Sequence, residues 1–294
     1  MACIVSTVNM KGGVGKTTLT VNIAACLAQN YGKRVLVLDL DSQISATLSL
    51  MQPHDFAKTR RQQRTLSSLI NQVINPNAKK QLAIAEMICP NICNLKNLAL
   101  LPGDIELYDE YSVSQMLHQE ATRQPDASFE AVWNNLERIL VKTIIDPVVN
   151  NYDYIFLDCA PGYNLLTRSG IAASNYYLLP ARPEPLSLVG IQLLERRVKK
   201  LKETYQNTHP VQLDLVGIVF TMSGGGLLGR YYKQVMRRIE KDFTPEQRFE
   251  TAIPMDINVA KAVDMFMPVV LAAPNSSGSK AFMKLTEEFL GKMP

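Results

Sequence analysis

The sequence predicts an α/β fold, in which a doubly wound, mostly parallel sheet has helices on both faces. Short β-branched runs alternate with helical patterns along the 294 residues. Most of these runs are nearly continuous in apolar residues, as strands are when helices cover both faces of a parallel sheet. The segments between them carry apolar residues at helical spacings of three and four, for example Ile191, Leu194, Val198 and Leu201. This alternation predicts one layer of strands between two layers of helices.

Seven strands are expected, in the order in which the apolar runs occur. They lie at residues 3–9, 34–39, 98–101, 154–158, 176–180, 213–221 and 250–253. Two regions depart from the alternating pattern. Residues 51–95 contain a polar stretch and are a possible helical insertion, and the glycine-rich residues 223–229 are expected to form a mobile loop. We see no internal repeat or long linker, so we expect one domain over residues 1–294.

The composition is typical of a cytoplasmic globular protein. Hydrophobic residues make up 47% of the chain and charged residues 20%. No window approaches the roughly 18 consecutive apolar residues that a membrane-spanning helix needs. The first strand-like run has neither a basic flank nor a small-residue cleavage site, so we expect no secretory signal. We therefore expect no stable membrane association.

The five cysteines are expected to be reduced, structural thiols, because most of them lie in or beside apolar runs. Cys89 and Cys93 have a spacing that a metal ion or an iron–sulfur cluster can use, but a second pair at matching spacing is missing. We therefore expect no metal site at these two cysteines.

A glycine-rich string between a predicted strand and a predicted helix is the strongest functional signal. It reads Asn-Met-Lys-Gly-Gly-Val-Gly-Lys-Thr-Thr over residues 9–18. Glycines let backbone N–H groups curl around phosphate oxygens, and the start of the following helix attracts negative charge. Lys16 is placed to reach the β- and γ-phosphates of ATP, and Thr17 to offer its hydroxyl to Mg²⁺. The expected nucleotide-binding residues of this loop are Lys11, Gly12, Gly13, Val14, Gly15, Lys16, Thr17 and Thr18.

Lys11 is an additional lysine in this loop. The string departs from the standard Walker A motif at Met10, where a glycine is usual. Lys11 lies too close to the end of the strand to share the role of Lys16. Its expected role is to reach the phosphates of a second subunit, so we expect a homodimer in the ATP state. Both lysines are expected to be catalytic.

Aspartates at two strand ends are expected to complete the site. Asp158 ends the strand at residues 154–158, where a Walker B aspartate holds Mg²⁺ or one of its waters. Asp39 and Asp41 end the second strand, at the sheet edge where ligands bind. We favour Asp41 for orienting the attacking water, because Asp39 is more embedded in the apolar run. A helix cap or a turn position is the alternative role for each aspartate. The expected metal residues are Thr17, Asp41 and Asp158, and Asp41 is also expected to be catalytic.

A basic segment in the second half of the chain predicts a surface for a polyanion. Residues 195–241 hold ten Lys/Arg and four Asp/Glu. The cations lie off the apolar stripes of two helical patterns, and adjacent basic helices can follow DNA phosphates with little base readout. A merely solvated face is the other interpretation of such a charge run. The expected DNA-binding residues are Arg196, Arg197, Lys199, Lys200, Arg230, Lys233, Arg237 and Arg238.

Together these motifs resemble the ParA/Soj family of partition ATPases, within the larger group that includes MinD. The resemblance covers nearly the whole chain. Residues 11–18 read as the family's deviant Walker A motif, and residues 39–43 look like its Asp-x-Asp-Pro-Gln segment. Residues 158–161 stand where the family has Asp-Thr-Pro-Pro, and residues 252–256 look like its adenine-contacting loop. Further similar segments are residues 101–107 and 179–190.

The resemblance implies a cycle that uses ATP and Mg²⁺. ATP binding forms a sandwich dimer, the dimer binds double-stranded DNA without sequence preference, and a ParB-like or cargo-adaptor protein stimulates an otherwise slow hydrolysis and release. Such a protein would be cytoplasmic and nucleoid-associated, and it would segregate DNA or distribute a cellular cargo. By position, Lys11 would act across the dimer, Asp41 would position water, and Pro254 and Asp256 would face the base.

Four positions depart from the family's pattern. Ser42 replaces the usual proline, Ile44 and Ser45 replace the usual Gly-Asn, and Asp256 stands where the family often has asparagine. None of these changes removes a group that the chemistry needs.

Three other functions stay open at this stage. A MinD-like membrane-associated regulator needs an amphipathic C-terminal helix with a basic face. The helix expected over residues 281–294 instead carries Glu287 and Glu288 opposite its lysines, and we expect it to pack on the sheet. A redox ATPase of the nitrogenase-reductase type needs cysteines that meet at the dimer axis, for which Cys89 and Cys93 are poorly suited. A switch protein that binds ATP without hydrolysing it differs only in its hydrolysis rate.

Overall fold

Seven strands form one parallel sheet in the order β3-β2-β4-β1-β5-β6-β7. The protein is represented by a computed structural model that describes residues 1–74, 83–108, 114–115, 118–119, 122, 128–207, 210–223, 237, 239 and 241–294. The strands are β1 (Cys3–Thr7), β2 (Val35–Asp39), β3 (Leu98–Leu101), β4 (Tyr154–Asp158), β5 (Tyr176–Ala181), β6 (Asp214–Ser223) and β7 (Ile253–Pro254). The predicted doubly wound α/β fold is confirmed.

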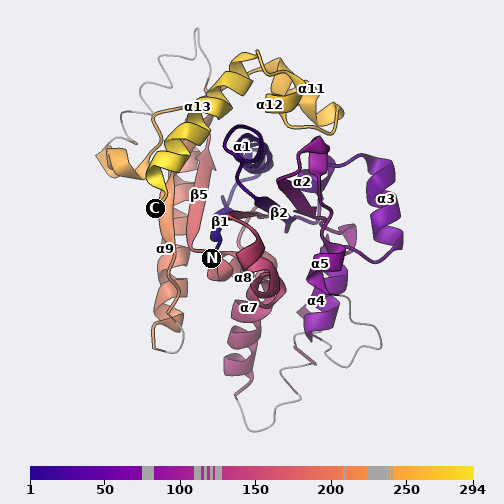
Figure 1. Cartoon of the computed structure of the whole chain (residues 1–294). Coiled ribbons are helices and arrows are strands. Elements are labelled where there is room, and N and C mark those ends of the chain that lie inside the picture. The colour runs from indigo at the N-terminus through magenta and orange to yellow at the C-terminus, as the bar shows by residue number, and fades with distance from the viewer. Residues whose placement is uncertain are drawn as a thin grey trace.

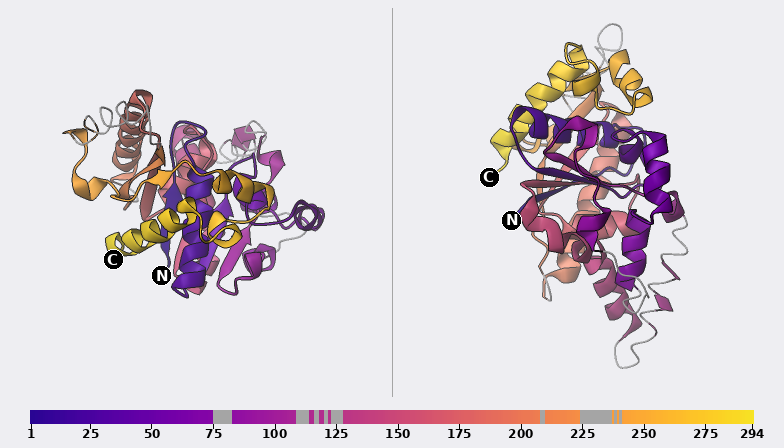
Figure 2. Two further views of the ribbon diagram at one scale, coloured as in Figure 1. Left: turned by 90° about the horizontal axis from the view of Figure 1, so that it is seen from above. Right: turned by 45° about the vertical axis from the view of Figure 1, so that its right-hand side comes forward.

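Helices cover both faces of this sheet (Figures 1 and 2). One face carries α1 (Lys16–Asn30), α2 (Ser45–Leu48), α11 (Ile257–Asp264), α12 (Val269–Ala272) and α13 (Ser277–Lys292). The opposite face carries α4 (Leu66–Ile74), α5 (Ile84–Met87), α7 (Phe129–Ile145), α8 (Leu165–Ala173) and α9 (Pro185–Tyr205). The short helix α3 (Pro53–Arg61) lies next to α2, at the far right of Figure 1. Short 3₁₀ segments are η1 (Ile92–Asn94), η2 (Ile105–Tyr108), η3 (Asp146–Asn151) and η5 (Pro245–Gln247).

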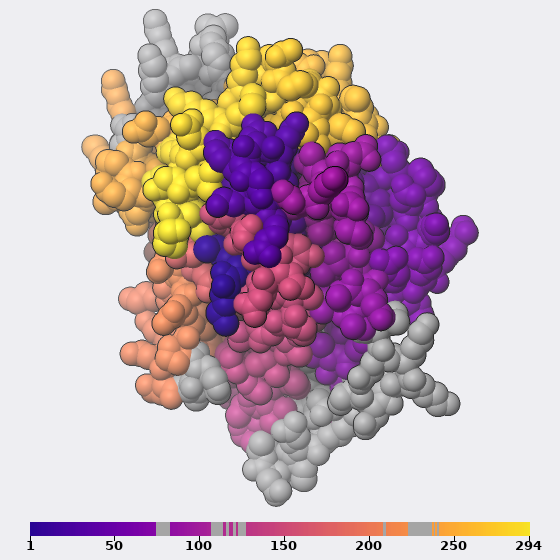
Figure 3. Space-filling view, viewed as in Figure 1, coloured from indigo at the N-terminus to yellow at the C-terminus, as the bar shows by residue number. Residues whose placement is uncertain are grey.

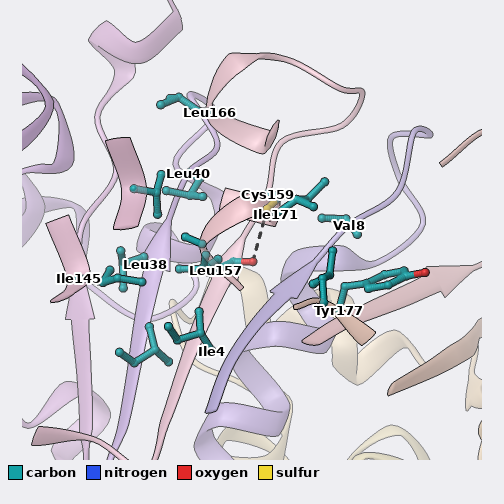
Figure 4. Packing of buried hydrophobic residues seen from close by; sticks show 14 of the residues in the cluster. Ile4, Val8, Leu38, Leu40, Ile145, Leu157, Cys159, Leu166, Ile171 and Tyr177 are labelled. Atoms are coloured by element: carbon teal, nitrogen blue, oxygen red, sulfur yellow. Dashed lines mark hydrogen bonds between the residues drawn. The ribbon is translucent and has the colours of Figure 1, made fainter. Parts of the chain in front are cut away.

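Alternation along the strands divides the apolar residues between two cores. In β4, Ile155 and Leu157 pack on the α7 side of the sheet, whereas Tyr154 and Phe156 pack on the α1 side. Successive side chains of a strand point to opposite faces, so a continuous apolar run supplies both cores. Figure 4 shows the α7-side core, with Leu38 beside Ile145 and Leu157. Each fully buried side chain of this kind stabilises the fold by about 1.5–3 kcal/mol.

Helix α1 is buried on nearly all sides, because the sheet lies on one side of it and α12 and α13 on the other. Figure 3 shows α13 lying against the N-terminal segment at the surface. The Phe289 ring of α13 reaches through to the sheet, with its centroid 5.7 Å from that of Tyr154 and 5.9 Å from that of Phe156. The prediction that the C-terminal helix packs on the sheet is confirmed. Among the described residues, no helix has both the length and the apolar character to cross a membrane.

Some predicted boundaries need correction. The last strand begins at Ile253 rather than at Glu250, because the backbone N–H groups of Glu250 and Thr251 donate to the Glu288 carboxylate at 2.7 and 3.0 Å instead of to a neighbouring strand. Within residues 51–95, α4 buries Leu66, Leu69, Ile70 and Ile74 in the α7-side core, so part of this region belongs to the main body. Whether it is an insertion, and whether the chain forms one domain, stay predictions. The predicted glycine-rich loop lies outside the described residues beyond Ser223.

Candidate nucleotide-binding site

The loop between β1 and α1 forms a backbone cradle at the carboxyl edge of the sheet. Gly13 and Gly15 have φ angles of 69° and 86°, in the left-handed region that other residues adopt at a cost. Val14 is buried beneath the loop, and its carbonyl accepts a 2.7 Å hydrogen bond from the Thr221 hydroxyl of β6. Helix α1 starts without a side-chain cap, so its first N–H groups are left for another acceptor. A cradle of this form suits a phosphate group.

A cavity of about 560 Å³ opens in front of this cradle. Its walls come from the loop and the start of α1, from the segment after β2, from the loop after β4, and from the end of β6 and α11. The lining residues are Gly12, Gly13, Gly15, Lys16, Thr17, Thr18, Asp41, Gln43, Ser45, Leu48, Ser49, Pro161, Met222 and Val263. A volume of this size is within the range of small-molecule sites in proteins.

Lys16 is buried at the start of α1, with its residue only 7% exposed. Its ammonium donates to the carbonyl oxygen of Lys11 at 3.3 Å, which curls the side chain back over the loop. Burial lowers the pKa of Lys16, and the negative charges of Asp158 and Asp41 oppose that shift. The ammonium has three N–H donors, so a phosphate oxygen in the cradle can be bound without breaking this contact.

Asp158 connects the end of β4 to α1 through two threonines. The Thr17 hydroxyl donates to Oδ2 at 2.7 Å, and the Thr20 hydroxyl lies 3.0 Å from Oδ1. The parallel register aligns Asp158 with Thr7 of β1 and Asp39 of β2. Burial raises the pKa of Asp158 above its ordinary value. The predicted pair Thr17 and Asp158 is thus brought together, and Thr20 is an additional member that the sequence reasoning missed.

Asp39 and Asp41 have different environments. Asp39 is fully buried, and its carboxylate accepts hydrogen bonds from the N–H and the hydroxyl of Thr47, both at 2.7 Å. Burial and the neighbouring Asp158 raise the pKa of Asp39. Asp41 borders the cavity, and its Oδ1 accepts from the N–H of Gln43 at 3.0 Å. Of the two, Asp41 therefore has the position from which a carboxylate can act on a bound ligand.

Lys11 points away from Lys16. Its ammonium lies 2.7 Å from Oε2 of Glu184, the residue before α9, and the two side chains are 39% and 34% exposed. Arg182 lies 3.7 Å from the same carboxylate. Lys11 and Arg182 hold the pKa of Glu184 below its ordinary value. Glu184 is a site residue that the sequence reasoning missed; an isolated acidic residue just after a strand end, in a segment matched to the family, was the available signal.

The predicted base-facing pair does not border the described cavity. Asp256 is the N-cap of α11, where its carboxylate accepts from the N–H of Asn258 at 2.8 Å. The same carboxylate accepts from the N–H of Gly278 at 2.7 Å and from the hydroxyl of Ser277 at 2.8 Å. These bonds tie α11 to the start of α13 and give Asp256 a structural role. A base-facing role for Asp256 and Pro254 stays a prediction.

The predicted DNA-binding residues are only partly described. Arg196, Arg197, Lys199 and Lys200 are exposed on α9, as the amphipathic pattern of that helix predicts, and Arg237 is also exposed. The remaining predicted residues, Arg230, Lys233 and Arg238, lie outside the described residues.

Cys89 and Cys93 both take part in packing. The backbone of Cys89 pairs with Leu100 of β3 through bonds of 2.8 and 2.9 Å. The Cys93 thiol lies 3.6 Å from the carbonyl oxygen of Leu50, and burial raises its pKa to about 11.

A glycine cradle that precedes a helix, with a buried lysine above it and a strand-end aspartate beside it, defines the site of a P-loop NTPase. A family model described as an AAA domain matches residues 2–211. The sporulation initiation inhibitor protein Soj of Bacillus subtilis (strain 168) is 29% identical over 289 residues, which cover 98% of this chain and 98% of that relative. The chromosome-partitioning ATPase Soj of Treponema pallidum (strain Nichols) is 26% identical over 290 residues, which cover 97% and 96%.

A solved structure has the same fold. Cyanthece apo McdA superposes with a TM-score of 0.69 at 18% identity, and the match covers 99% of this chain and 100% of that chain. The chain belongs to the AAA-domain family of the matching model and, within it, to the ParA/Soj type of partition ATPases.

Proposed function

We propose that this protein is an ATPase that forms an ATP-bound homodimer, binds duplex DNA without sequence preference in that state, and leaves DNA when a partner protein stimulates its slow hydrolysis. The observation that carries this proposal is that the side chains of the two lysines in the loop point in different directions. Lys16 curls over the cradle, whereas Lys11 extends outward to the half-exposed Glu184. A lysine at the rim of a phosphate site has a position from which it can contact the phosphates of a nucleotide bound in a second subunit.

The residues of the site fit ATP and Mg²⁺. The glycine cradle and the N-terminus of α1 suit the phosphates, and Lys16 supplies a buried positive charge beside them. Thr17 and Asp158 offer oxygen ligands of the kind that Mg²⁺ prefers, and Asp41 borders the same cavity. Mg²⁺ held there would neutralise negative charge on the phosphates during transfer. We expect Thr17, Asp41 and Asp158 to hold it directly or through water.

Hydrolysis needs a water in line with the bond that breaks. The water oxygen forms a bond to the γ-phosphorus while the bond between that phosphorus and the oxygen retained by ADP breaks, and the proton of the water leaves with the phosphate. Asp41 would orient this water, while Lys16 and Lys11 of the partner copy would stabilise the charge that develops on the phosphoryl oxygens. Because Lys11 comes from the other copy, hydrolysis would require the dimer.

The surface around Lys11 supports a second copy as its partner. Leu186 and Val189, in the first turns of α9, are 70% and 60% exposed and lie shortly after Glu184 along the chain. Large apolar side chains grouped on a surface are typical of interaction sites. A dimer that covers them would bring the Lys11 of each copy toward the cavity of the other.

The DNA face would include the exposed cations of α9, together with Arg237 and the predicted residues Arg230, Lys233 and Arg238. Contacts of lysine and arginine with phosphates give affinity without sequence information. The protein would then be cytoplasmic and nucleoid-associated, and a ParB-like or cargo-adaptor protein would set its release. The segregated cargo would be DNA or a protein assembly.

The test is binding to random-sequence duplex DNA with ATP, with ADP and without nucleotide, at two salt concentrations. Asp41→Ala should keep ATP binding while slowing hydrolysis, and so should hold the ATP state. ATP-selective binding that weakens with salt is the expected result. Binding that is equal in all three nucleotide states contradicts the proposed cycle, and so does the absence of binding in any state.

Lys11→Ala provides the matched test of the dimer. This variant should bind ATP as a monomer but fail to dimerise, and it should hydrolyse ATP more slowly than the wild type. Normal dimerisation and normal hydrolysis would show that Lys11 does not act across subunits.

A further inference from the structure

A second cavity, of about 290 Å³, lies between α7, α8 and α9. It opens on the α7 side of the sheet, where α8 packs on α7 and the Tyr205 hydroxyl of α9 donates to the carbonyl oxygen of Asn134 in α7 at 2.9 Å. Its walls combine aromatic rings with cations. The main lining side chains are Trp133, Tyr163, Arg168, Arg197, Lys200 and Tyr205.

The charges that line this cavity favour an anion. Among the described lining residues the carboxylate is that of Glu137, which is 7% exposed and accepts two hydrogen bonds from Arg168, at 2.8 and 2.7 Å. That carboxylate is therefore already matched by one guanidinium. Arg197 and Lys200 add two further positive charges, and in the described part of the chain no carboxylate lies within 4.0 Å of either. The cavity thus keeps an excess of positive charge.

The neighbouring cations of α9 behave differently. Lys199 lies 3.9 Å from Glu203, and Lys202 lies 3.7 Å from Asp214, so both have an acidic partner. The helical spacing places Arg197 and Lys200 on the stripe that faces α7, while Arg196 and Lys199 lie on the other side of the helix outside the cavity. The basic residues of α9 therefore divide into two stripes.

The aromatic rings fix the direction of the guanidinium groups. The Arg197 guanidinium carbon lies 5.8 Å from the centre of the Tyr163 ring, and that of Arg168 lies 5.8 Å from the same ring. The Tyr163 hydroxyl donates to the backbone carbonyl of Arg197 at 3.3 Å, which joins the loop after β4 to α9. A guanidinium that lies against a ring keeps the N–H groups of its edge for another partner, and oxyanions such as phosphate match that edge.

We propose that this cavity is a phosphate-binding site and that, in the DNA-bound state, it takes one phosphate of the duplex backbone between Arg197 and Lys200. This assignment rests on the proposed function for the source of the phosphate. The cavity is also connected to the phosphate cradle, because Tyr163 belongs to the loop that follows Asp158. The N–H of Gly162 in that loop donates to the carbonyl oxygen of Asn9, just before the phosphate cradle, at 3.4 Å.

The chain contains a reporter for this site, because Trp133 is its single tryptophan and lines the cavity. The experiment titrates the full chain with random-sequence duplex DNA in the presence of ATP and follows tryptophan fluorescence. The anisotropy of labelled DNA is measured in parallel, so that binding anywhere on the surface is detected independently. Inorganic phosphate is titrated in a separate series.

Two matched double variants are compared with the wild type. Arg197→Ala with Lys200→Ala removes the proposed ligands, whereas Arg196→Ala with Lys199→Ala removes the same charge from the other stripe of α9. At DNA concentrations that saturate binding by anisotropy, we expect the Trp133 signal to change in the wild type and in the second variant, whose lost contacts lie outside the cavity, but not in the first. We also expect the first variant to lower the slope of log K against log salt by about 0.9, as the loss of one phosphate contact does.

Several results would contradict the phosphate-site assignment or the proposed function. DNA binding with no change in Trp133, or a change that persists in Arg197→Ala with Lys200→Ala, overturns the assignment. If DNA does not bind at all, the proposed function fails. The titration with inorganic phosphate then decides alone whether the cavity binds phosphate. A phosphate response that the first variant loses then supports the site, and no response overturns it.

Discussion

The contact with Glu184 restrains Lys11, the lysine that we propose acts across the dimer. Both side chains are more than one-third exposed, so solvent screens their 2.7 Å contact. Pairs of this kind contribute about 0.2–1 kcal/mol. If Lys11 must leave Glu184 to reach a second copy, each copy loses the free energy of this contact when the dimer forms. Glu184→Gln should therefore lower the dissociation constant of the ATP dimer by up to roughly 5-fold per released lysine, since 1.4 kcal/mol changes an equilibrium constant tenfold.

Sedimentation of the ATP-bound chain in an Asp41→Ala background gives the dimer dissociation constant that checks this magnitude. Glu203→Gln is the matched control, because it removes an equivalent carboxylate beside Lys199 on the exposed part of α9. We expect the control to leave the dissociation constant unchanged. A weaker dimer in Glu184→Gln would show that Glu184 itself contacts the second copy, and an unchanged one would show that the pair does not restrain Lys11.

Three further predictions concern stability. Phe289→Ala should lower the free energy of unfolding by about 3–5 kcal/mol, because its ring is fully buried against β4, and urea denaturation that shows less than 1 kcal/mol would contradict this packing. Gly170→Val should lower it by about 1–3 kcal/mol, because even a Cβ at this position would lie 2.7 Å from Leu40 Cδ1, and an unchanged melting temperature would contradict it. N–H donors hold the pKa of Asp256 at about 2, below the unfolded value of about 3.9, so its contribution is present above pH ~4 and is lost as pH falls toward 2. The urea concentration at the unfolding midpoint should therefore change less with pH in Asp256→Ala than in the wild type over this range. Identical pH profiles of the two proteins would exclude the effect.

Local patterns explain why most of the fold could be predicted. The run that forms β4 is apolar up to its final aspartate because helices cover both faces of the sheet. The glycine string of residues 9–18 lies between a strand-like run and a helical pattern, so its structural setting could be recognised from the sequence. The choice of Asp41 over Asp39 also depended on local burial, and the structure gives the two aspartates the environments expected of them.

Contacts between distant parts of the chain explain what could not be predicted. Glu184 meets Lys11 only because β1 and β5 are neighbours in the sheet, and the resulting contact joins residues 173 positions apart. The start of β7 depends on Glu288 of α13, which no local pattern connects to Glu250. The bonds that tie Asp256 to the start of α13 likewise join distant parts of the chain, so the loop motif around Asp256 could not predict them.

The packing of α13 on α1 also constrains how the protein is made. Helix α1 is complete once Asn30 is synthesised, but the apolar residues that cover it come from the last helix of the fold. At roughly 5–20 residues per second, the ribosome needs on the order of 10–50 s to deliver them. During this time the helix that follows the phosphate cradle has an uncovered apolar face. A nascent chain therefore cannot complete the packing behind the phosphate cradle until translation has passed α13.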